Sequence, residues 1–206
     1  MDRPTPMHRL LQGEVGSGKT VVALRAMLAA VEAGGQAALL APTEVLAIQH
    51  HRSITAMLGP LAEGGMLSFG DEADASTRVV LLTGSMPRRA RSAALTEIAA
   101  GTAGIVVGTH AIFQDVVEFH DLALVVVDEQ HRFGVAQRGL LTARDDTRPH
   151  ELVLTATPIP RTVAMTVFGD LEVSTLAQLP SGRAEVQTTV VDLPIHQAWL
   201  DRAWQR

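Results

Sequence analysis

A glycine-rich octapeptide constrains the fold of this 206-residue chain more than any other segment. Its sequence at residues 13–20, Gly-Glu-Val-Gly-Ser-Gly-Lys-Thr, fits the pattern G-x-x-x-x-G-K-[ST] in full. The backbone N–H groups of such a loop converge on phosphate oxygens where the loop joins a strand to the first turn of a helix. The apolar pair Leu10-Leu11 precedes the loop, and a helical pattern follows it from about Lys19 to Glu32. We therefore predict a phosphate-binding loop that holds a nucleotide.

Each residue type in the loop suits this chemistry. Lys19 can reach the β- and γ-phosphates, and the Thr20 hydroxyl can bind Mg²⁺. The predicted nucleotide-binding residues are Gly13, Glu14, Val15, Gly16, Ser17, Gly18, Lys19 and Thr20. Because Lys19 is the only lysine in the chain, the sequence excludes a protein kinase, which needs a lysine on a later strand, and a GTPase with an Asn-Lys-x-Asp guanine-binding motif.

The composition fits an intracellular protein with a substantial core. Hydrophobic residues make up 47% of the chain and charged residues 19%, which suits one domain or one domain plus part of another. The absence of cysteine excludes disulfides, a thiolate zinc site and a cysteine nucleophile. The longest apolar run, Leu122–Val127, is too short to cross a membrane, and the start has no signal-peptide pattern. We expect a cytoplasmic protein without a membrane partner.

Short apolar segments alternate with helical patterns along the chain. The predicted strands are Ala37–Ala41, Val79–Leu82, Ile105–Val107, Leu122–Val127 and Leu152–Leu154. The predicted helices after the first span Glu44 to about Leu58 and Pro87 to near Gly101, and residues 64–76 are interpreted as a surface loop. Strands that are apolar throughout are buried on both faces, so the pattern predicts an α/β fold with a doubly wound parallel sheet.

Two polar segments follow predicted strands. Asp128 and Glu129 come directly after Leu122–Val127, where Asp128 would hold Mg²⁺ through water and Glu129 would polarise the attacking water. Thr155 and Thr157 follow the next strand, where their hydroxyls could hydrogen-bond the side chains of residues 130 and 131. On the residues alone, a solvated turn and a threonine helix cap remain open alternatives.

The order of these motifs resembles the first motor domain of superfamily 2 helicases. That order is the phosphate loop, Asp-Glu-Gln-His at 128–131 and Thr-Ala-Thr-Pro at 155–158, with segments 41–47 and 108–110 similar to motifs Ia and Ib. More narrowly, segments 10–13, 128–135, 155–162 and 179–183 resemble the RecG family of branch-migration helicases. Gln130 favours this family over the transcription-repair coupling translocase and the replication-restart helicase, which carry Asp-Glu-Glu-His.

The resemblance implies a RecA-like, P-loop NTPase helicase domain that uses ATP and Mg²⁺ to remodel forked or branched DNA. It implies catalytic roles for Lys19, Asp128, Glu129, Gln130 and His131, with Thr155 and Thr157 coupling hydrolysis to DNA movement. It implies that the DNA backbone is contacted by Thr43, Thr83, Gly84, Ser85, Thr109 and His110. For Thr43 and Thr109, helix capping is an equally good reading of the residues.

The resemblance also implies a domain organisation. We predict a first RecA-like, ATP-binding domain at 1–178, a linker at 179–185 and the start of a truncated second RecA-like domain at 186–206. This last segment reads as a strand at Val186–Val191 followed by a short helical piece. A C-terminal arm that packs back on the first domain is the alternative. The intact, monomeric protein is expected to supply a wedge domain and the second motor domain, with its arginine finger, in cis.

Other polar clusters are interpreted more simply. The four arginines Arg78, Arg88, Arg89 and Arg91 fit either phosphate contacts or, more simply, a solvated helix face. The pair His50-His51 is interpreted as surface rather than site. The remaining alternatives to a RecG-like motor are a motor like the transcription-repair coupling translocase and a P-loop switch or kinase without a nucleic-acid partner.

Because the arginine finger belongs to the second motor domain, we expect the 206-residue chain alone to bind nucleotide weakly and not to act as a helicase. ATP turnover of the isolated chain, measured with and without branched DNA, should stay near background in both conditions. Turnover that DNA stimulates to the rate of the full-length protein would contradict this expectation.

Overall fold

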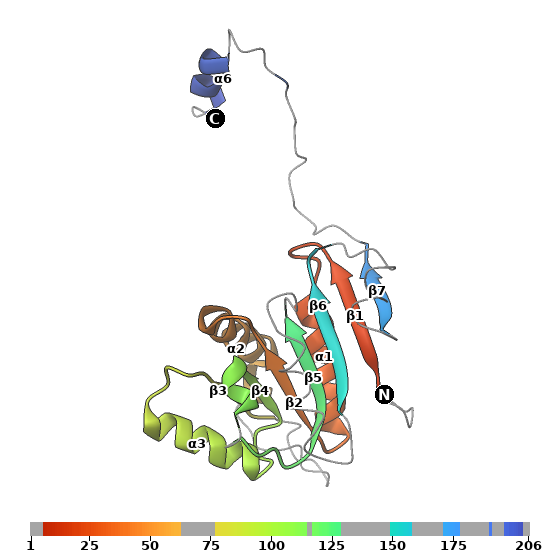
Figure 1. Ribbon diagram of the computed structural model, residues 1–206, viewed down its shortest axis with the longest axis vertical. Helices are drawn as coiled ribbons and strands as arrows, with labels where there is room; N and C mark the ends of the chain where they lie inside the picture. The colour runs from red at the N-terminus through yellow and green to blue at the C-terminus, as the bar shows by residue number, and fades with distance from the viewer. Residues whose placement is uncertain are drawn as a thin grey trace.

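Seven parallel strands form one sheet at the centre of the described chain (Figure 1). The structure, a computed structural model, describes residues 6–62, 77–114, 117–128, 149–157, 171–177, 190 and 196–203. The strands are β1 (His8–Gly13), β2 (Gln36–Leu40), β3 (Val79–Leu82), β4 (Ile105–Gly108), β5 (Leu122–Asp128), β6 (His150–Thr155) and β7 (Glu172–Leu176). Their order across the sheet is β3-β4-β2-β5-β6-β1-β7, and every pair is parallel.

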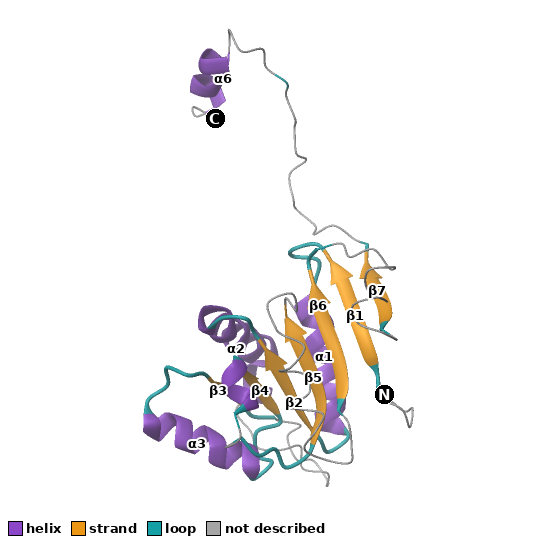
Figure 2. Ribbon diagram, viewed as in Figure 1, coloured by secondary structure: helices purple, strands orange, loops and turns teal. Residues whose placement is uncertain are grey.

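Helices cover both faces of this sheet (Figure 2). The helical elements are α1 (Lys19–Glu32), α2 (Glu44–Leu58), η1 (Gly59–Ala62), α3 (Arg88–Ala99), η2 (His110–Phe113) and α6 (His196–Ala203). Leu39 and Val126 share one core cluster with apolar residues of α1 and α2. Their chain neighbours Ala38 and Val125 share the second cluster with residues of α3. This alternation confirms the doubly wound α/β fold.

The burial of the central strands explains why their sequences are apolar throughout. Every residue of β2 and β4 is buried, because each strand has a layer of side chains on either face. Gln36 is the polar exception in β2, and its amide is fully used. It donates to the carbonyls of Ile98 and Ala103 and accepts from the N–H groups of His120 and Asp121. These hydrogen bonds compensate the cost of removing the Gln36 amide from water.

Most element bounds match the sequence prediction, and one strand was missed. The helices at 19–32 and 44–58 and the strand at 79–82 have the bounds predicted. Strand β7 was not predicted, because it carries Glu172, Ser174 and Thr175 and pairs only with β1 at the sheet edge. An edge strand needs no continuous apolar run, so its pattern is weak.

Several predicted segments cannot be compared with the structure. The predicted loop at 64–76 and the linker at 179–185 lie outside the described residues, as does the predicted strand at 186–191 apart from Val190. The domain bounds therefore remain predictions. Helix α6 lies within the predicted C-terminal helical piece. None of the helices in the described ranges is both long and apolar enough to cross a membrane.

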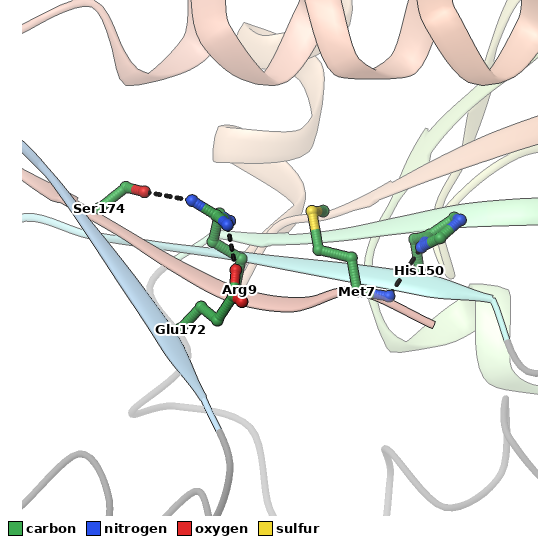
Figure 3. A network of polar contacts seen from close by, with 5 residues as sticks. All are labelled: Met7, Arg9, His150, Glu172 and Ser174. Atoms are coloured by element: carbon green, nitrogen blue, oxygen red, sulfur yellow. Dashed lines mark hydrogen bonds and ion pairs between the residues drawn. The ribbon is translucent and has the colours of Figure 1, made fainter. Parts of the chain in front are cut away.

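Polar contacts join β1 and the residue before it to both neighbouring strands (Figure 3). The Met7 N–H donates to Nδ1 of His150 over 2.7 Å. On the other side, the Arg9 guanidinium donates to Ser174 Oγ over 2.7 Å and to the Glu172 carboxylate. These contacts add to the backbone ladders that fix β1 between β6 and β7.

The partial burial of His150 makes the stability of the fold depend on pH. Burial lowers the pKa of His150 below its ordinary value of 6.5. As the pH falls through 6.5, the unfolded chain takes up a proton at this histidine before the folded chain does. We therefore expect the free energy of unfolding, measured by denaturant titration, to decrease as the pH is lowered below 6.5 and to recover above it.

His150→Asn should reduce this dependence, because an amide oxygen can replace Nδ1 as the acceptor without titrating. His120→Asn is the matched control, since the side chain of His120 is exposed. Equal pH slopes for His150→Asn and the unmodified chain would show that this histidine is not responsible.

Candidate functional site

Three predicted motifs lie at one edge of the sheet because their strands are adjacent. Strands β5, β6 and β1 are neighbours, so the residues that follow them meet at the carboxyl edge. The register pairs Gln12 with Thr155, and Asp128 with Leu154. With strands about 4.8 Å apart, Asp128 lies about 10 Å across the sheet from β1, which precedes the phosphate loop. This span suits a nucleotide phosphate chain with its metal ion.

The loop between β1 and α1 presents hydrogen-bond donors that the described chain does not use. Gly16 and Gly18 have φ angles of 83° and 90°, in the left-handed region that glycine adopts readily. No side chain of the described residues caps the start of α1 at Gly18. The Ser17 hydroxyl is buried and has no hydrogen-bond partner among the described residues. Uncapped N–H groups at a helix start, beside a buried hydroxyl without a partner, suit a bound anion.

The Lys19 ammonium is hydrogen-bonded to two backbone carbonyls at the start of this loop. Its Nζ donates to the Gly13 carbonyl over 2.7 Å and to the Glu14 carbonyl over 2.8 Å. A Cβ atom at Gly13 would lie 2.6 Å from Ser17 Oγ and 3.0 Å from Leu176 Cβ, so the loop packs closely onto the strand ends. The positive charge of Lys19 therefore stands within the loop, close to the start of α1 and the partly exposed Thr20.

Asp128 contacts a histidine that the sequence analysis did not assign to the site. His50 Nε2 lies 2.7 Å from Asp128 Oδ2, and the side chains of these residues are only 13% and 15% exposed. The interpretation of His50 as a surface residue was therefore wrong. His50 follows the buried residue Ala47 by three positions and precedes the buried residue Ile54 by four, which places it on the core-facing stripe of α2. That spacing was the signal available in the sequence.

The neighbouring histidine also has a partner. His51 Nε2 donates to the Val79 carbonyl over 3.3 Å, so it joins α2 to β3 and not to the phosphate edge. Among the described residues, no group of three or more His, Cys, Asp or Glu side chains gathers in a way that could hold a metal ion. A metal at this edge would therefore depend on fewer protein ligands, as Mg²⁺ commonly does when substrate phosphates complete its shell.

Thr155, the last residue of β6, contacts Thr157, which follows the strand. Thr155 Oγ1 lies 2.9 Å from Thr157 Oγ1 and accepts from the Thr157 N–H over 3.2 Å. Thr155 is 2% exposed. Glu129, Gln130 and His131 lie outside the described residues, so their predicted contacts with this pair remain predictions.

The residues predicted to contact the DNA backbone follow β2, β3 and β4. These strands form the other half of the same sheet edge. Thr43 caps α2, since its Oγ1 accepts from the Leu46 N–H over 3.3 Å. Gly84, Ser85 and His110 are exposed. Thr83 and Thr109 are each 2% exposed, so their hydroxyls lie below the surface that these loops present.

Glu44 joins two of these loops. Its carboxylate accepts from the Ser85 N–H over 3.0 Å and from Ser85 Oγ over 2.5 Å. The hydrogen bonds from the Ser85 side chain and backbone hold the pKa of Glu44 below its ordinary value. The start of α2 and the loop after β3 are therefore connected through one ionised carboxylate.

The arginines near these loops divide into two groups. Arg91 donates to the Thr83 carbonyl over 3.3 Å and to Gln114 Oε1 over 2.6 Å, and Arg78 pairs with Glu97 over 2.8 Å. These two residues stabilise the local structure. Arg88 and Arg89 are exposed in the first turn of α3. Arg88 and Arg89 therefore place positive charge beside the loop that contains Gly84 and Ser85.

Comparison with known proteins places this geometry among helicases. Residues 5–166 match the DEAD/DEAH box helicase family. The chain is 61% identical over 203 residues to the ATP-dependent DNA helicase RecG of Mycobacterium tuberculosis (strain ATCC 25618 / H37Rv) and 57% identical to that of Mycobacterium leprae (strain TN). Each match covers 98% of this chain and 27% of the relative, so the chain spans about a quarter of the length of these relatives.

The fold of the chain also matches that of a solved helicase structure. The structure of RecG bound to a three-way DNA junction matches with a TM-score of 0.75 and 38% sequence identity. The match covers 98% of this chain and 25% of that one. The RecA-like form of the doubly wound sheet, predicted from the motifs, is thereby confirmed.

A glycine at each end of α1 allows a matched test of the phosphate loop. Gly18 and Gly34 have φ angles of 90° and 91°, and a Cβ atom at either would meet nothing within 4 Å. Gly18→Ala and Gly34→Ala should each therefore destabilise the fold by about 1–2 kcal/mol through backbone strain alone.

Only Gly18→Ala should also weaken nucleotide binding, because only Gly18 sets the direction of the N–H groups at the start of α1. Calorimetric titration with ATP would measure the difference. Equal affinities of the two variants would show that the loop geometry does not determine binding.

Proposed function

The chain belongs to the DEAD/DEAH box helicase family, and on that premise we propose that it is the ATP-binding motor half of a RecG-like DNA helicase. Such a motor couples ATP hydrolysis to remodelling or branch migration of forked and branched DNA in recombination and repair. One observation supports this proposal most strongly. The neighbouring strands β1, β6 and β5 bring the phosphate loop and Asp128 to the same edge of the sheet.

The phosphate loop fits the triphosphate of ATP. The buried Ser17 hydroxyl and the start of α1, neither of which is bound by a side chain of the described residues, provide donors for phosphate oxygens. Lys19 would exchange its contacts with the Gly13 and Glu14 carbonyls for the β- and γ-phosphates. Charge neutralisation by a compact ammonium within the loop is the contribution of this residue.

Thr20 and Asp128 fit a magnesium ion. Thr20 would supply a hydroxyl oxygen from the first turn of α1, and Asp128, at the end of β5, would hold the ion through water. When bound, Mg²⁺ would neutralise negative charge on the β- and γ-phosphates. Glu129 is proposed to polarise the attacking water, and Gln130 and His131 to couple hydrolysis to movement together with the Thr155–Thr157 pair.

The other half of the edge fits a DNA backbone. Gly84, Ser85 and His110 are exposed there, and Arg88 and Arg89 add positive charge. Small donors and arginines contact phosphate without reading bases, as a motor that moves along DNA requires. Because Thr83 and Thr109 are buried, we propose that they act by shaping their loops. Thr43 would act from the start of α2, which it caps.

The complete motor requires parts beyond this edge. We propose that a wedge domain and a second motor domain with an arginine finger act in cis in a monomeric, cytoplasmic protein. The length of the relatives, almost four times that of the match, supports the presence of further domains. A motor like the transcription-repair coupling translocase is less favoured, since the similar proteins named above carry the RecG name. A switch or kinase without a DNA partner is disfavoured by the helicase family match.

The function can be tested by ATPase measurements on the full-length protein that carries this chain. Branched DNA should stimulate ATP turnover, and Lys19→Ala should abolish turnover with or without DNA, because the phosphate loop holds no second ammonium that could contact the phosphates. Arg25→Ala, which changes another basic residue of α1, is the control and should retain stimulated turnover. Lack of stimulation by any branched DNA would favour the switch interpretation.

A further inference from the structure

The contact between His50 and Asp128 is not explained by the roles assigned so far. His50 supplies the side-chain hydrogen bond that Asp128 receives from the described residues, over 2.7 Å. An ionised carboxylate only accepts, so Nε2 of His50 carries the donated hydrogen. Both side chains are largely shielded from water. The contact therefore restricts a carboxylate at the carboxyl edge of the sheet, where the proposed metal would bind.

The helix that carries His50 is held firmly in place. Ala47 and Ile54 of α2 are fully buried in the core, and Thr43 caps its first turn. Six residues before His50, Glu44 accepts both hydrogen bonds from Ser85. These two polar contacts lie about 9 Å apart along the helix axis. One helix thus contacts the proposed DNA-facing loop near its start and the proposed metal ligand in its middle.

We propose that His50 is a positioning residue that orients the Asp128 carboxylate for metal binding and connects it, through α2, to the Glu44–Ser85 contact at the DNA-facing edge. The proposal rests on the proposed function of this edge as an ATPase motor. His50 does not contact the substrate in this account. Its contribution is the orientation of the carboxylate, which leaves Oδ1 available to a metal-bound water.

The chemistry of carboxylate ligands gives the size of the expected effect. A hydrogen bond to one oxygen fixes the plane of the carboxylate and the direction of the other oxygen. Loss of such a supporting contact typically lowers metal affinity by about 10- to 100-fold. In His50→Ala, the Asp128 side chain would lose its donor and rotate freely at the end of β5.

Magnesium binding tests the positioning role without relying on turnover. In the full-length protein with fluorescently labelled ADP, the Mg²⁺ concentration that gives half the fluorescence change is measured for each variant. His50→Ala should raise this midpoint by about 10- to 100-fold. His50→Gln should restore it, because its amide nitrogen can occupy the place of Nε2, whereas the shorter His50→Asn should not. His51→Ala is the matched control, because among the described residues the hydrogen bond of the His51 side chain goes to the Val79 carbonyl.

The same titration with branched DNA present tests the connection through α2. By linkage, DNA that favours the oriented carboxylate lowers the Mg²⁺ midpoint. We expect this shift in the unmodified protein and in His51→Ala but not in His50→Ala. If His50→Ala does not fold, the comparison of His50→Asn with His50→Gln decides the question.

Three experimental outcomes would each contradict a different part of the proposal. Equal midpoints for His50→Ala and His51→Ala would overturn the positioning role. A DNA shift that persists in His50→Ala would overturn the connection through α2. Failure of the unmodified protein to hydrolyse ATP in response to DNA would instead overturn the proposed function, while the midpoints without DNA would still decide the role of His50.

Discussion

The backbone hydrogen bonds that join β5, β6 and β1 in parallel register determine where the chemistry lies. They pair Asp128 with Leu154 and Thr155 with Gln12, and so align three strand ends that are far apart in the sequence. A slip of one residue in this register would turn every buried side chain of a strand to the opposite face. The apolar layers on both faces therefore fix the relative positions of the phosphate loop and Asp128.

The same sheet supplies both halves of the proposed motor edge. The ends of β1, β5 and β6 carry the proposed nucleotide residues, and the loops after β2, β3 and β4 carry the proposed DNA-facing residues. Helix α2 contacts both halves through polar side chains, Glu44 toward Ser85 and His50 toward Asp128. Because Ala47 and Ile54 bury this helix in the core, both contacts are made from one firmly packed element.

Local patterns predicted most of this fold, whereas contacts between distant segments were harder to predict. The helix at 19–32 and the strand at 79–82 follow from apolar periodicity and from the glycines that end the helix. Strand β7 was missed because pairing with β1 alone leaves it half polar. The role of His50 was missed because its partner, Asp128, lies 78 residues further along the chain.

In the candidate site, too, local motifs could be predicted from the sequence, whereas contacts between distant residues could not. The phosphate loop could be identified because its chemistry is encoded in eight consecutive residues. Glu44 was not identified, because its carboxylate is bound by Ser85, a residue 41 positions away that only the folded sheet brings near. The burial of Thr83 and Thr109 was equally hidden, since a threonine after a strand suits a surface loop or a buried turn equally well. The roles of Glu129, Gln130 and His131 remain predictions.

The central claim is that the carboxyl edge of β1, β6 and β5 binds a magnesium nucleotide. Amide chemical shifts of the ¹⁵N-labelled chain, recorded during titration with ADP and Mg²⁺, test it most directly. The account predicts the largest changes at Gly16, Gly18, Lys19 and Thr20, with a further change at Asp128 that requires Mg²⁺. Changes confined to the opposite edge, around Met7 and His150, would contradict it.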